Sequence, residues 1–270
     1  MANSEKKTEK KTEKKLYLLD AMALIYRAHF ALIRSPRFTT SGVCTSAVFG
    51  VANTVFDIIS KYEPTHLAVA FDTREPTFRH QAFPEYKAQR DALPEDIAVQ
   101  FPLVDRLFEA MDITMIRKPG FEADDIIGTL SVEAEAAGFE TFMVTPDKDY
   151  TQLVSEHVTM FKPGRQGGSP EMLGVKEVLE KWQIERVDQV VDILGLMGDA
   201  SDNIPGVPGI GPKTAQKLIA KFGSMESLLE NTDQLKGKQK ERVEENKDQA
   251  ILSKELVTIC LDVPPDIALD

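Results

Sequence analysis

Short apolar runs that end in acidic residues recur along this chain, and they constrain what it can fold into. Residues 16–19 are followed by Asp20, residues 66–71 by Asp72, residues 141–145 by Asp147 and Asp149, and residues 193–197 by Asp199 and Asp202. An apolar run of four to eight residues bounded by polar ones is typical of a buried strand. Carboxylates gathered at strand ends repel one another, so they need cations between them. The pattern therefore predicts a divalent-metal site.

Segments with helical spacing alternate with these runs. Strands are expected at 16–19, 66–71, 112–116, 141–145 and 158–161, and helices at 43–62 and 122–137. Such an alternation indicates a mostly parallel sheet with helices on both faces. From about residue 175 the pattern is helical, with helices expected at 176–183, 187–197, 213–222, 224–230 and near 249–257. The predicted fold class is α/β, followed by a smaller helical region.

The chain divides into three predicted parts. Residues 1–15 form a Lys/Glu/Thr-rich tail, expected to be disordered, to which no function is attached. Residues 16–175 form the α/β core, which carries an insertion at 73–102 beside the end of strand 66–71. Residues 176–270 form the helical region, with a helix–hairpin–helix at 203–222.

Composition limits the class of protein. The chain has 270 residues and a net charge of −11, from 43 acidic and 32 basic residues, which taken alone argues against binding nucleic acid. Metals bound to the acidic clusters would offset part of that charge. No apolar run is long enough to cross a membrane, and the start of the chain lacks the features of a signal peptide. Cys44 and Cys260 are then expected to be reduced thiols of a cytoplasmic protein.

The acidic residues fall where a parallel sheet binds ligands, outside the carboxyl ends of its strands. Glu122, Asp124 and Asp125 open helix 122–137 at the same edge. Hard oxygen ligands without His or Cys favour Mg²⁺ or Mn²⁺ over Zn²⁺. Each group has a plainer explanation: a helix N-terminus attracts acids, turns use Asp, and strand-end Asp residues cap the next segment of the chain. The convergence of all of them on one edge favours the metal site.

A glycine-rich segment points to nucleic acid. Residues 203–214 read NIPGVPGIGPKT, with helices expected on both sides. Gly206, Gly209 and Gly211 allow backbone N–H groups to approach a phosphate, and a helix N-terminus adds positive potential. The residues expected to add contacts here are Lys213, Thr214 and Lys217. Such a contact reads phosphates without sequence preference. A plain Pro/Gly connection between two helices is the alternative.

The insertion 73–102 interleaves basic and aromatic residues. Its basic residues include Arg74, Arg79, His80, Lys87 and Arg90, and its rings include Phe78, Phe83 and Tyr86. Single-stranded nucleic acid is bound by such a mixture, because charge follows the backbone and rings stack on bases. A solvated loop explains the composition equally well. Its place beside Asp72 favours substrate contact.

Taken together, these motifs resemble the 5′-nuclease domain of bacterial DNA polymerase I, within the flap endonuclease family. The resemblance runs from Leu16 to about Leu261. Its most specific parts are LLDAMALIYRAHFAL, AVAFDTREPTFRHQAFPEYKAQR, GFEADDIIGTL, TPDKDYTQL and GDASDNIPGVPGIGPKTA. In such polymerases a polymerase domain follows, so this chain is expected to be either an excised domain or a free-standing nuclease.

The resemblance implies the role of each site residue. Two or more Mg²⁺ or Mn²⁺ ions are implied. The carboxylates matching the first metal are Asp20, Asp72, Glu122, Asp124 and Asp125, and those matching the second are Asp147, Asp149, Asp199 and Asp202. Tyr86, Lys87 and Arg90 match the arch that clamps the 5′ strand and approaches the scissile phosphate, with Arg79 a weaker match. The hairpin 203–222 matches an element that grips duplex DNA and binds K⁺.

The implied activity is structure-specific 5′-3′ exonuclease and 5′-flap endonuclease cleavage of DNA by a two-metal-ion mechanism, in replication and repair. The expected partner is DNA with a 5′ flap, 5′ overhang or nick. No membrane partner is expected, and the chain is expected to be a monomer of the bacterial cytoplasm and nucleoid. Two alternatives are a structure-specific DNA-binding module without catalysis and a metal-dependent RNase of the PIN type. The complete acidic set disfavours the first, and the glycine hairpin disfavours the second.

Overall fold

The computed structural model describes residues 14–90, 93–164 and 168–264. Most of the predicted N-terminal tail lies outside these residues. Lys15, which was assigned to that tail, already belongs to the first strand, β1 (Lys15–Asp20). Within the described ranges, no helix is long and apolar enough to cross a membrane.

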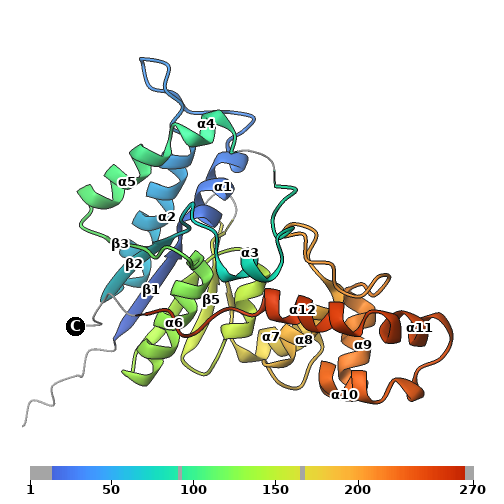
Figure 1. Cartoon of the computed structure of the whole chain (residues 1–270). Helices are drawn as coiled ribbons and strands as arrows, with labels where there is room; N and C mark the ends of the chain where they lie inside the picture. Colours follow the sequence, from blue (N-terminus) through green and yellow to red (C-terminus); the bar gives the residue numbers. More distant parts are fainter. Residues whose placement is uncertain (1–13, 91–92, 165–167, 265–270) are drawn as a thin grey trace, which may run out of the picture.

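A six-stranded sheet forms the centre of the molecule, in the order β3-β2-β1-β4-β5-β6 (Figure 1). Besides β1 its strands are β2 (His66–Phe71), β3 (Thr114–Arg117), β4 (Glu140–Val144), β5 (Val158–Lys162) and β6 (Glu171–Leu173). The first five are parallel, and the edge strand β6 runs antiparallel to β5. The predicted α/β class is therefore confirmed. All five predicted strands are present, while β6 was not predicted.

Alternate residues of the strands point to opposite faces of the sheet, and each face has its own core. Tyr17 and Leu19 pack with α1 (Ala21–Ala31), α2 (Ser46–Tyr62) and α5 (Phe101–Ala110). Leu16 and Leu18 face the other way, toward α6 (Ala123–Ala136) (Figure 1). This two-residue period is the geometry of a strand covered on both sides. The prediction of helices on both faces is confirmed.

Several helices differ from the predictions. The sequence pattern did not reveal α1, because it follows β1 without a loop. Its N-cap is Asp20, whose carboxylate accepts a hydrogen bond from the Ala23 amide at 3.0 Å. Helix α2 begins at Ser46 rather than at residue 43, since Phe38 and Cys44 pair in an antiparallel bridge just before it. The insertion carries the short helices α3 (Phe78–Ala82) and α4 (Glu95–Ala98).

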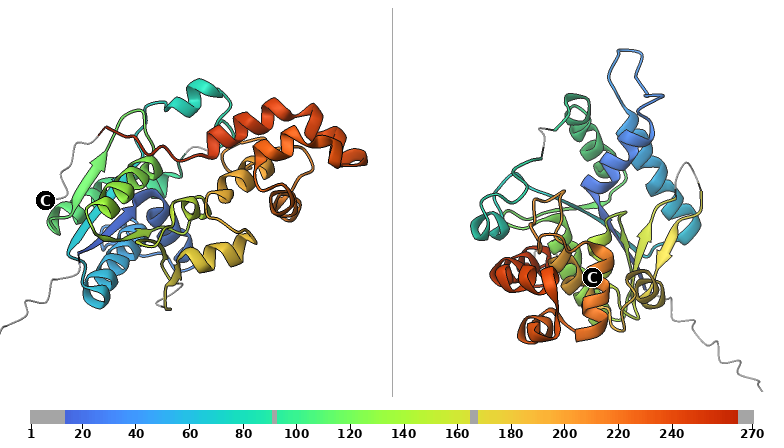
Figure 2. Two further views of the ribbon diagram at one scale, coloured as in Figure 1. Left: turned by 90° about the horizontal axis from the view of Figure 1, so that it is seen from below. Right: turned by 90° about the vertical axis from the view of Figure 1, so that its right-hand side faces the viewer.

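The helical region follows β6 and lies beside the sheet (Figure 2). It comprises α7 (Val175–Trp182), α8 (Gln189–Met197), α9 (Pro212–Phe222), α10 (Met225–Glu230), α11 (Gly237–Glu245) and α12 (Lys247–Val257). Short 3₁₀ turns, η1 (Lys148–Leu153) and η3 (Thr232–Gln234), complete the described elements. Five of these helices match predicted segments. Helix α11 lies in the charged run 236–248. It was not predicted because this polar run lacks an apolar stripe with helical spacing.

After α12 the chain runs back across α6, and we call residues 258–263 the C-terminal strap (Figure 1). The Ile259 amide donates to Gln152, and the Val263 amide donates to Thr129 of α6. A Cβ at Gly128 would lie 2.8 Å from Ile259, so this glycine permits the close approach of strap and helix. The end of the helical region is thereby fixed to the core.

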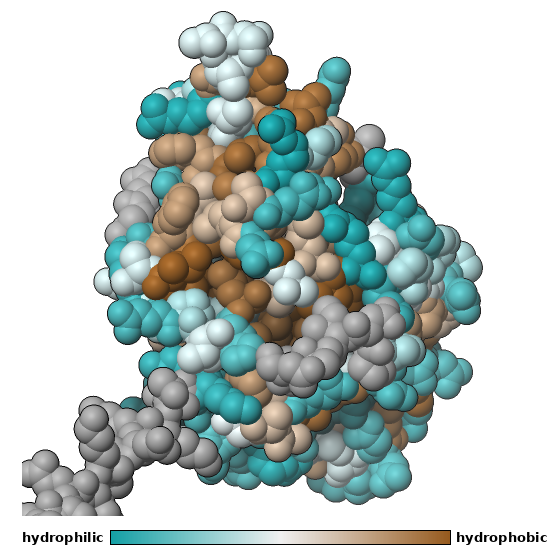
Figure 3. Space-filling model, turned by 90° about the vertical axis from the view of Figure 1, so that its left-hand side faces the viewer, coloured by the Kyte–Doolittle hydropathy of each residue, from teal (hydrophilic) through white to brown (hydrophobic). Residues whose placement is uncertain are grey.

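Figure 3 shows the face of the molecule opposite the helical region, where an apolar area is bordered by hydrophilic residues. Large exposed apolar side chains of the described residues cluster in sequence around the connection from α1 to α2. They include Phe30, Ile33, Phe38, Val43 and Phe49.

Candidate metal and nucleic-acid site

The carboxyl ends of the central strands bring the predicted acidic residues of the core together. Asp20 ends β1, Asp72 follows β2, and Asp147 follows β4. Asp72 accepts a hydrogen bond from the Ala123 amide at 2.9 Å, which places it against the start of α6. Tyr150 and Thr145 both donate to Asp20 at 3.1 Å, which joins the ends of β1 and β4. The sheet edge is thus a single acidic surface.

These carboxylates are crowded enough to disturb their ionisation. Burial and the nearby charge of Asp72 raise the pKa of Asp20 from 3.8 to about 7. Burial raises the pKa of Asp124 well above its usual value. Burial and the charge of Asp147 raise the pKa of Asp149. All three groups would ionise together readily only beside cations.

A second acidic group joins the core to the helical region. Asp199, just after α8, is bridged to η1 by Lys148, whose ammonium donates to the Asp199 carboxylate and lies 3.2 Å from Asp149 Oδ1. Although burial lowers the pKa of Lys148, Asp149 and Asp199 raise it overall. The lysine therefore stays charged between the carboxylates. Sequence reasoning gave Lys148 no role, although it lies within the TPDKDYTQL motif.

The arch residues lie on the acidic surface. Lys87 Nζ donates to Glu122 at 2.7 Å and lies 3.7 Å from Asp202. Arg90 forms an ion pair with Asp202. The phenol of Tyr86 donates to Glu122 at 2.9 Å and contacts Asp202 at 3.2 Å. Two predicted groups, the arch and the carboxylates of both halves, thus form one cluster.

Main-chain contacts hold this part of the arch to the loop that carries Asp202. The Lys87 amide donates to the Asp202 carbonyl at 2.9 Å. The Asn203 side chain donates to the Glu85 carbonyl at 2.7 Å. These bonds fix the base of the insertion against the helical region.

The carboxylate oxygens of the site are ligands suited to hard divalent ions. In this structure the positive charges beside them come from Lys and Arg side chains. Among the described residues, no three Asp, Glu, His or Cys side chains are arranged to hold a metal ion. Lys87, Arg90 and Lys148 instead neutralise the carboxylates. Asp149 Oδ1 is buried, and the Lys148 ammonium at 3.2 Å is the cation beside it. Carboxylate oxygens alone suit Mg²⁺ or Mn²⁺.

Asp125, predicted as a metal ligand, has its carboxylate surrounded by hydrogen-bond donors. It is completely buried, and both of its oxygens accept hydrogen bonds from Arg79, at 2.8 and 2.9 Å. The amides of Glu122 and Cys260 donate to the same carboxylate. With its lone pairs taken by four donors, Asp125 has none directed at an ion. In this structure Asp125 is therefore bound to Arg79, and its assignment to the first metal stays a prediction.

Two residues of the insertion predicted to contact DNA, Arg79 and Tyr86, are buried in this structure. The Arg79 side chain is 2% exposed and pairs with Asp125, so it does not reach a phosphate. The Tyr86 side chain is 3% exposed, so its ring is not available to stack on a base. Burial of these two side chains was not visible in the sequence, because both stand among exposed basic residues. Arg90 remains exposed, and Lys87 is partly so.

The hairpin has the predicted shape, but its glycines differ in role. The Gly206 amide donates to Ser253, and its carbonyl accepts from Gln249, so this buried glycine serves packing rather than phosphate binding. Gly209 and Gly211 are exposed, and Gly211 caps α9. On the first turns of α9, Lys213 and Lys217 are exposed and Thr214 is half-buried. Their arrangement leaves a basic helix N-terminus open to solvent.

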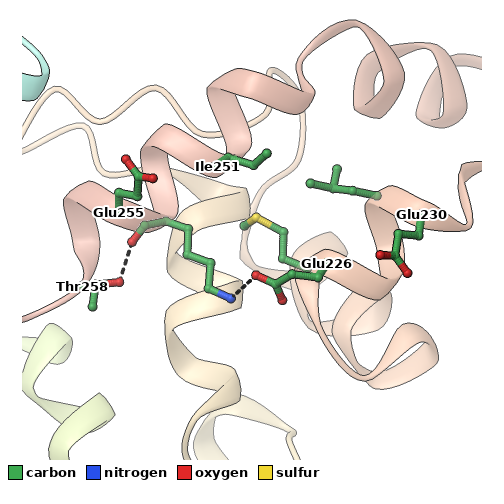
Figure 4. Close-up of a pocket in the computed structure, with 8 residues that line it drawn as sticks. Glu226, Glu230, Ile251, Glu255 and Thr258 are labelled. Atoms are coloured by element: carbon green, nitrogen blue, oxygen red, sulfur yellow. Dashed lines mark hydrogen bonds and ion pairs between the residues drawn. The ribbon is translucent and has the colours of Figure 1, made fainter.

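A groove of about 450 Å³ lies between α10 and α12 and includes no residue of the acidic cluster (Figure 4). Its lining residues include Glu226, Ile251, Glu255 and Thr258. Lys254 spans it, donating at 2.6 Å to Glu226 and lying 2.6 Å from the buried Asp192 of α8. This ion-pair network holds α12 to α8 and α10, and none of the predicted site residues lines the groove.

An α/β sheet with an acidic edge, a basic arch and a helical hairpin defines a nuclease-like architecture. Two family models match most of the chain. The 5′-3′ exonuclease N-terminal resolvase-like domain matches residues 15–183, and the 5′-3′ exonuclease C-terminal SAM fold matches residues 185–270. The chain belongs to the 5′-3′ exonuclease family.

Its relatives include bacterial DNA polymerases I. That of Bacillus caldotenax is 44% identical over 257 residues, covering 95% of this chain and 29% of the relative. That of Mycobacterium tuberculosis is 39% identical over 249 residues, covering 92% of this chain and 27% of the relative. The chain therefore spans less than a third of the length of these relatives.

Solved structures share the fold. Zinc-bound T5 5′-exonuclease matches with a TM-score of 0.72 and 22% identity, covering 90% of this chain and 89% of that chain. The bacteriophage T5 flap endonuclease in a pseudo-enzyme-product complex with DNA and metal ions matches with a TM-score of 0.70 and 24% identity, covering 92% and 89%. The catalytic core of Rad2 in complex with DNA substrate matches with a TM-score of 0.58, 17% identity, and coverage of 93% and 80%.

Proposed function

We propose that this chain is a metal-dependent 5′-nuclease that hydrolyses DNA near a 5′ end or at the base of a 5′ flap, as in primer or flap removal during replication and repair. The observation that carries the proposal is the single cluster formed by carboxylates of both halves with Lys87 and Arg90 of the arch. Membership in the 5′-3′ exonuclease family supports the reaction class.

The residues proposed to hold Mg²⁺ or Mn²⁺ are Asp20, Asp72, Glu122 and Asp124 in one group, and Asp147, Asp149, Asp199 and Asp202 in the other. When bound, such ions would lower the pKa of water and neutralise charge on the phosphate. Zinc-bound T5 5′-exonuclease, which shares this fold, supports a divalent-metal site. The raised pKa of Asp20 also fits a site that a cation completes.

The arch cations would act on the phosphate itself. In this structure Lys87 and Arg90 neutralise Glu122 and Asp202. When metal ions take over that role, the same ammonium and guanidinium become free to bind the scissile phosphate. Fixed positive charge at this position stabilises the negative charge that develops in the transition state. We assign the main stabilisation of the phosphate charge to Lys87, because Glu122 holds the Lys87 ammonium at the centre of the cluster.

The exposed start of α9 would hold the duplex. Helix N-terminal amides and the ammonium groups of Lys213 and Lys217 suit phosphate oxygens, and Gly209 and Gly211 leave the backbone accessible. Contacts of this kind carry no sequence information. Specificity should therefore depend on DNA structure. We also propose that the same hairpin binds K⁺. A polymerase domain joined to this nuclease, as in its relatives, is a separate part of the proposal.

The test is product mapping on a 5′-labelled flap substrate with Mg²⁺ and with EDTA. The proposal predicts short labelled products with 3′-hydroxyl ends in Mg²⁺ and none in EDTA. Flap binding without cleavage in either condition would instead identify a DNA-binding module. Faster cleavage of a matched RNA flap would identify an RNase.

A further inference from the structure

Arg79 is a buried cation whose hydrogen-bonding capacity is completely used. Its side chain is 2% exposed, and its guanidinium carbon lies 4.5 Å from the centre of the Phe78 ring. A guanidinium has five N–H groups. Their acceptors are Leu256 O at 2.9 Å, Asp125 Oδ2 at 2.9 Å, Glu122 Oε2 at 3.4 Å, Asp125 Oδ1 at 2.8 Å and Thr258 O at 2.9 Å. Nothing is left over for a phosphate.

Arg79 and these acceptors come from three parts of the chain. Arg79 itself belongs to α3 at the base of the arch, and Asp125 belongs to the first turn of α6. Leu256 and Thr258 lie where α12 passes into the C-terminal strap. The strap also donates its Cys260 amide to Asp125 at 2.8 Å. The bidentate ion pair therefore joins the arch to α6, and hydrogen bonds from the same two side chains join both to the strap.

The same network sets the position of Glu122 in two ways. Asp125 accepts a hydrogen bond from the Glu122 amide at 3.0 Å, which fixes the main chain at the start of α6. Arg79 and Tyr86 both donate to Glu122 Oε2, which fixes that oxygen. The other oxygen, Oε1, faces Lys87 and the rest of the acidic cluster. Glu122 is therefore oriented by Arg79, which makes no contact with the other carboxylates of the cluster except Asp125, and by Tyr86, which also contacts Asp202.

We propose that Arg79 is a positioning residue for Glu122, through which the arch and the C-terminal strap orient a carboxylate of the metal site. The inference rests on the proposed function for the meaning of Glu122. It differs from a DNA-contact role, which exposure would require. It also differs from simple packing, which would affect stability alone.

The test measures metal binding and DNA binding separately in Arg79→Met and Arg79→Lys. Calorimetry with Mn²⁺ in the absence of DNA should show weaker binding by about tenfold or more in Arg79→Met, as is typical when the partner that orients a ligand is lost. Arg79→Lys should recover part of the loss, because it keeps the charge but not the bidentate fork. Flap-DNA affinity in EDTA should equal that of the parent.

The matched control is Arg186→Met, which removes an exposed arginine paired with Asp188. It should leave Mn²⁺ affinity unchanged. Removing one partner of a buried ion pair destabilises a protein, so Arg79→Met is accompanied by the double variant Arg79→Met/Asp125→Asn, which leaves no unpaired buried charge. A folded variant of either kind that binds Mn²⁺ as tightly as the parent overturns the proposal.

Two further results would also overturn it. One is weaker flap binding by Arg79→Met with a smaller salt dependence, which is the sign of a lost phosphate contact. The other is a lower melting temperature with unchanged metal affinity, which is the sign of packing alone. Failure of the parent to cleave flaps would count against the nuclease proposal, while the Mn²⁺ comparison would still decide the role of Arg79.

Discussion

Several acidic residues of the site also stabilise the fold locally. Asp20 caps α1 with one oxygen and holds the end of β4 through Thr145 with the other. Glu122 is the N-cap of α6, and Asp147 caps η1. Capping of a backbone amide by the side chain is therefore correct for Asp20 and Asp147, whereas the Glu122 carboxylate bonds to Arg79, Tyr86 and Lys87. Capping does not exclude a metal role, because an ionised carboxylate has about four lone-pair sites and the hydrogen bonds to Asp20 use three of them.

Lys87 gives the sharpest prediction for a single side chain. Replacing it with Met keeps the length of the side chain and removes the charge proposed to stabilise the transition state. We expect kcat on a flap substrate to fall by about 10²–10³-fold, the usual effect of losing one such group. Single-turnover cleavage measures it. The control is Lys61→Met, at a surface lysine of α2 paired with Asp57, and equal rates for Lys87→Met and the parent would contradict the role.

The crowded carboxylates predict how pH and metal act on stability. The pKa of Asp20 is about 7 in the folded protein, against 3.8 as its usual value. The folded state thus holds this proton more tightly than the unfolded state, so the contribution of Asp20 to stability falls as pH rises from about 4 to about 7. A metal ion needs the ionised form. We expect Mg²⁺ to raise the melting temperature more at pH 8 than at pH 6.

The comparison is made with Asp20→Asn, which retains a good N-cap and removes the charge. Without metal, this variant should gain stability relative to the parent as pH rises from 5 to 8. Its Mg²⁺-induced rise in melting temperature should be smaller than that of the parent at pH 8. An identical response to Mg²⁺ at both pH values in the parent would contradict the account. Thermal melts of the two proteins are sufficient.

At the scale of elements, the hairpin shows how two glycines of one motif differ. Gly206 has a φ of +58°, and a Cβ there would lie 2.4 Å from the Gly198 nitrogen. Gly211 has no such contact, since a Cβ there meets nothing within 4 Å. The motif spacing is the same for both, so the sequence does not separate a packing glycine from an accessible one.

This difference is measurable as stability. We expect Gly206→Ala to lower the free energy of unfolding by about 1–3 kcal/mol or more, because it combines a strained backbone with a clash. Gly211→Ala is its matched control and should cost about 0.5–1 kcal/mol, because Gly211 is only the N-cap of α9. Urea unfolding of the two variants gives the comparison. Equal stability of both would show that the close approach at Gly206 is not needed.

The sequence predicted the strands and their acidic ends because both follow from local pattern. Residues 66–71 read as a buried strand from composition alone, and Asp72 stands directly after them. Helix α1 was missed because Asp20 starts it within the same motif that ends β1. The insertion was seen as basic and aromatic, but burial of Arg79 depends on Asp125 and on Thr258 of the strap, which lie 46 and 179 residues away in sequence.

At the scale of the whole molecule, charge explains how two halves make one site. Asp199 and Asp202 belong to the helical region, yet they pair with Lys148 of the core and with Lys87 and Arg90 of the arch. Both follow the apolar run 193–197, but this run lies in the helical region, so strand-end reasoning supported them only weakly and the family resemblance supplied their role. The division into a core at 16–175 and a helical region at 176–270 stays a prediction. The ion pairs show that the two parts are bound together around the acidic cluster.

The central claim is that this cluster is a metal site that cleaves DNA. The most direct test is the double variant Asp147→Ala/Asp149→Ala on a 5′-flap substrate in Mg²⁺, with flap binding measured in parallel. The account predicts that cleavage is lost while binding remains, because the hairpin and arch contacts do not include these residues. Cleavage by the double variant at the rate of the parent would contradict it.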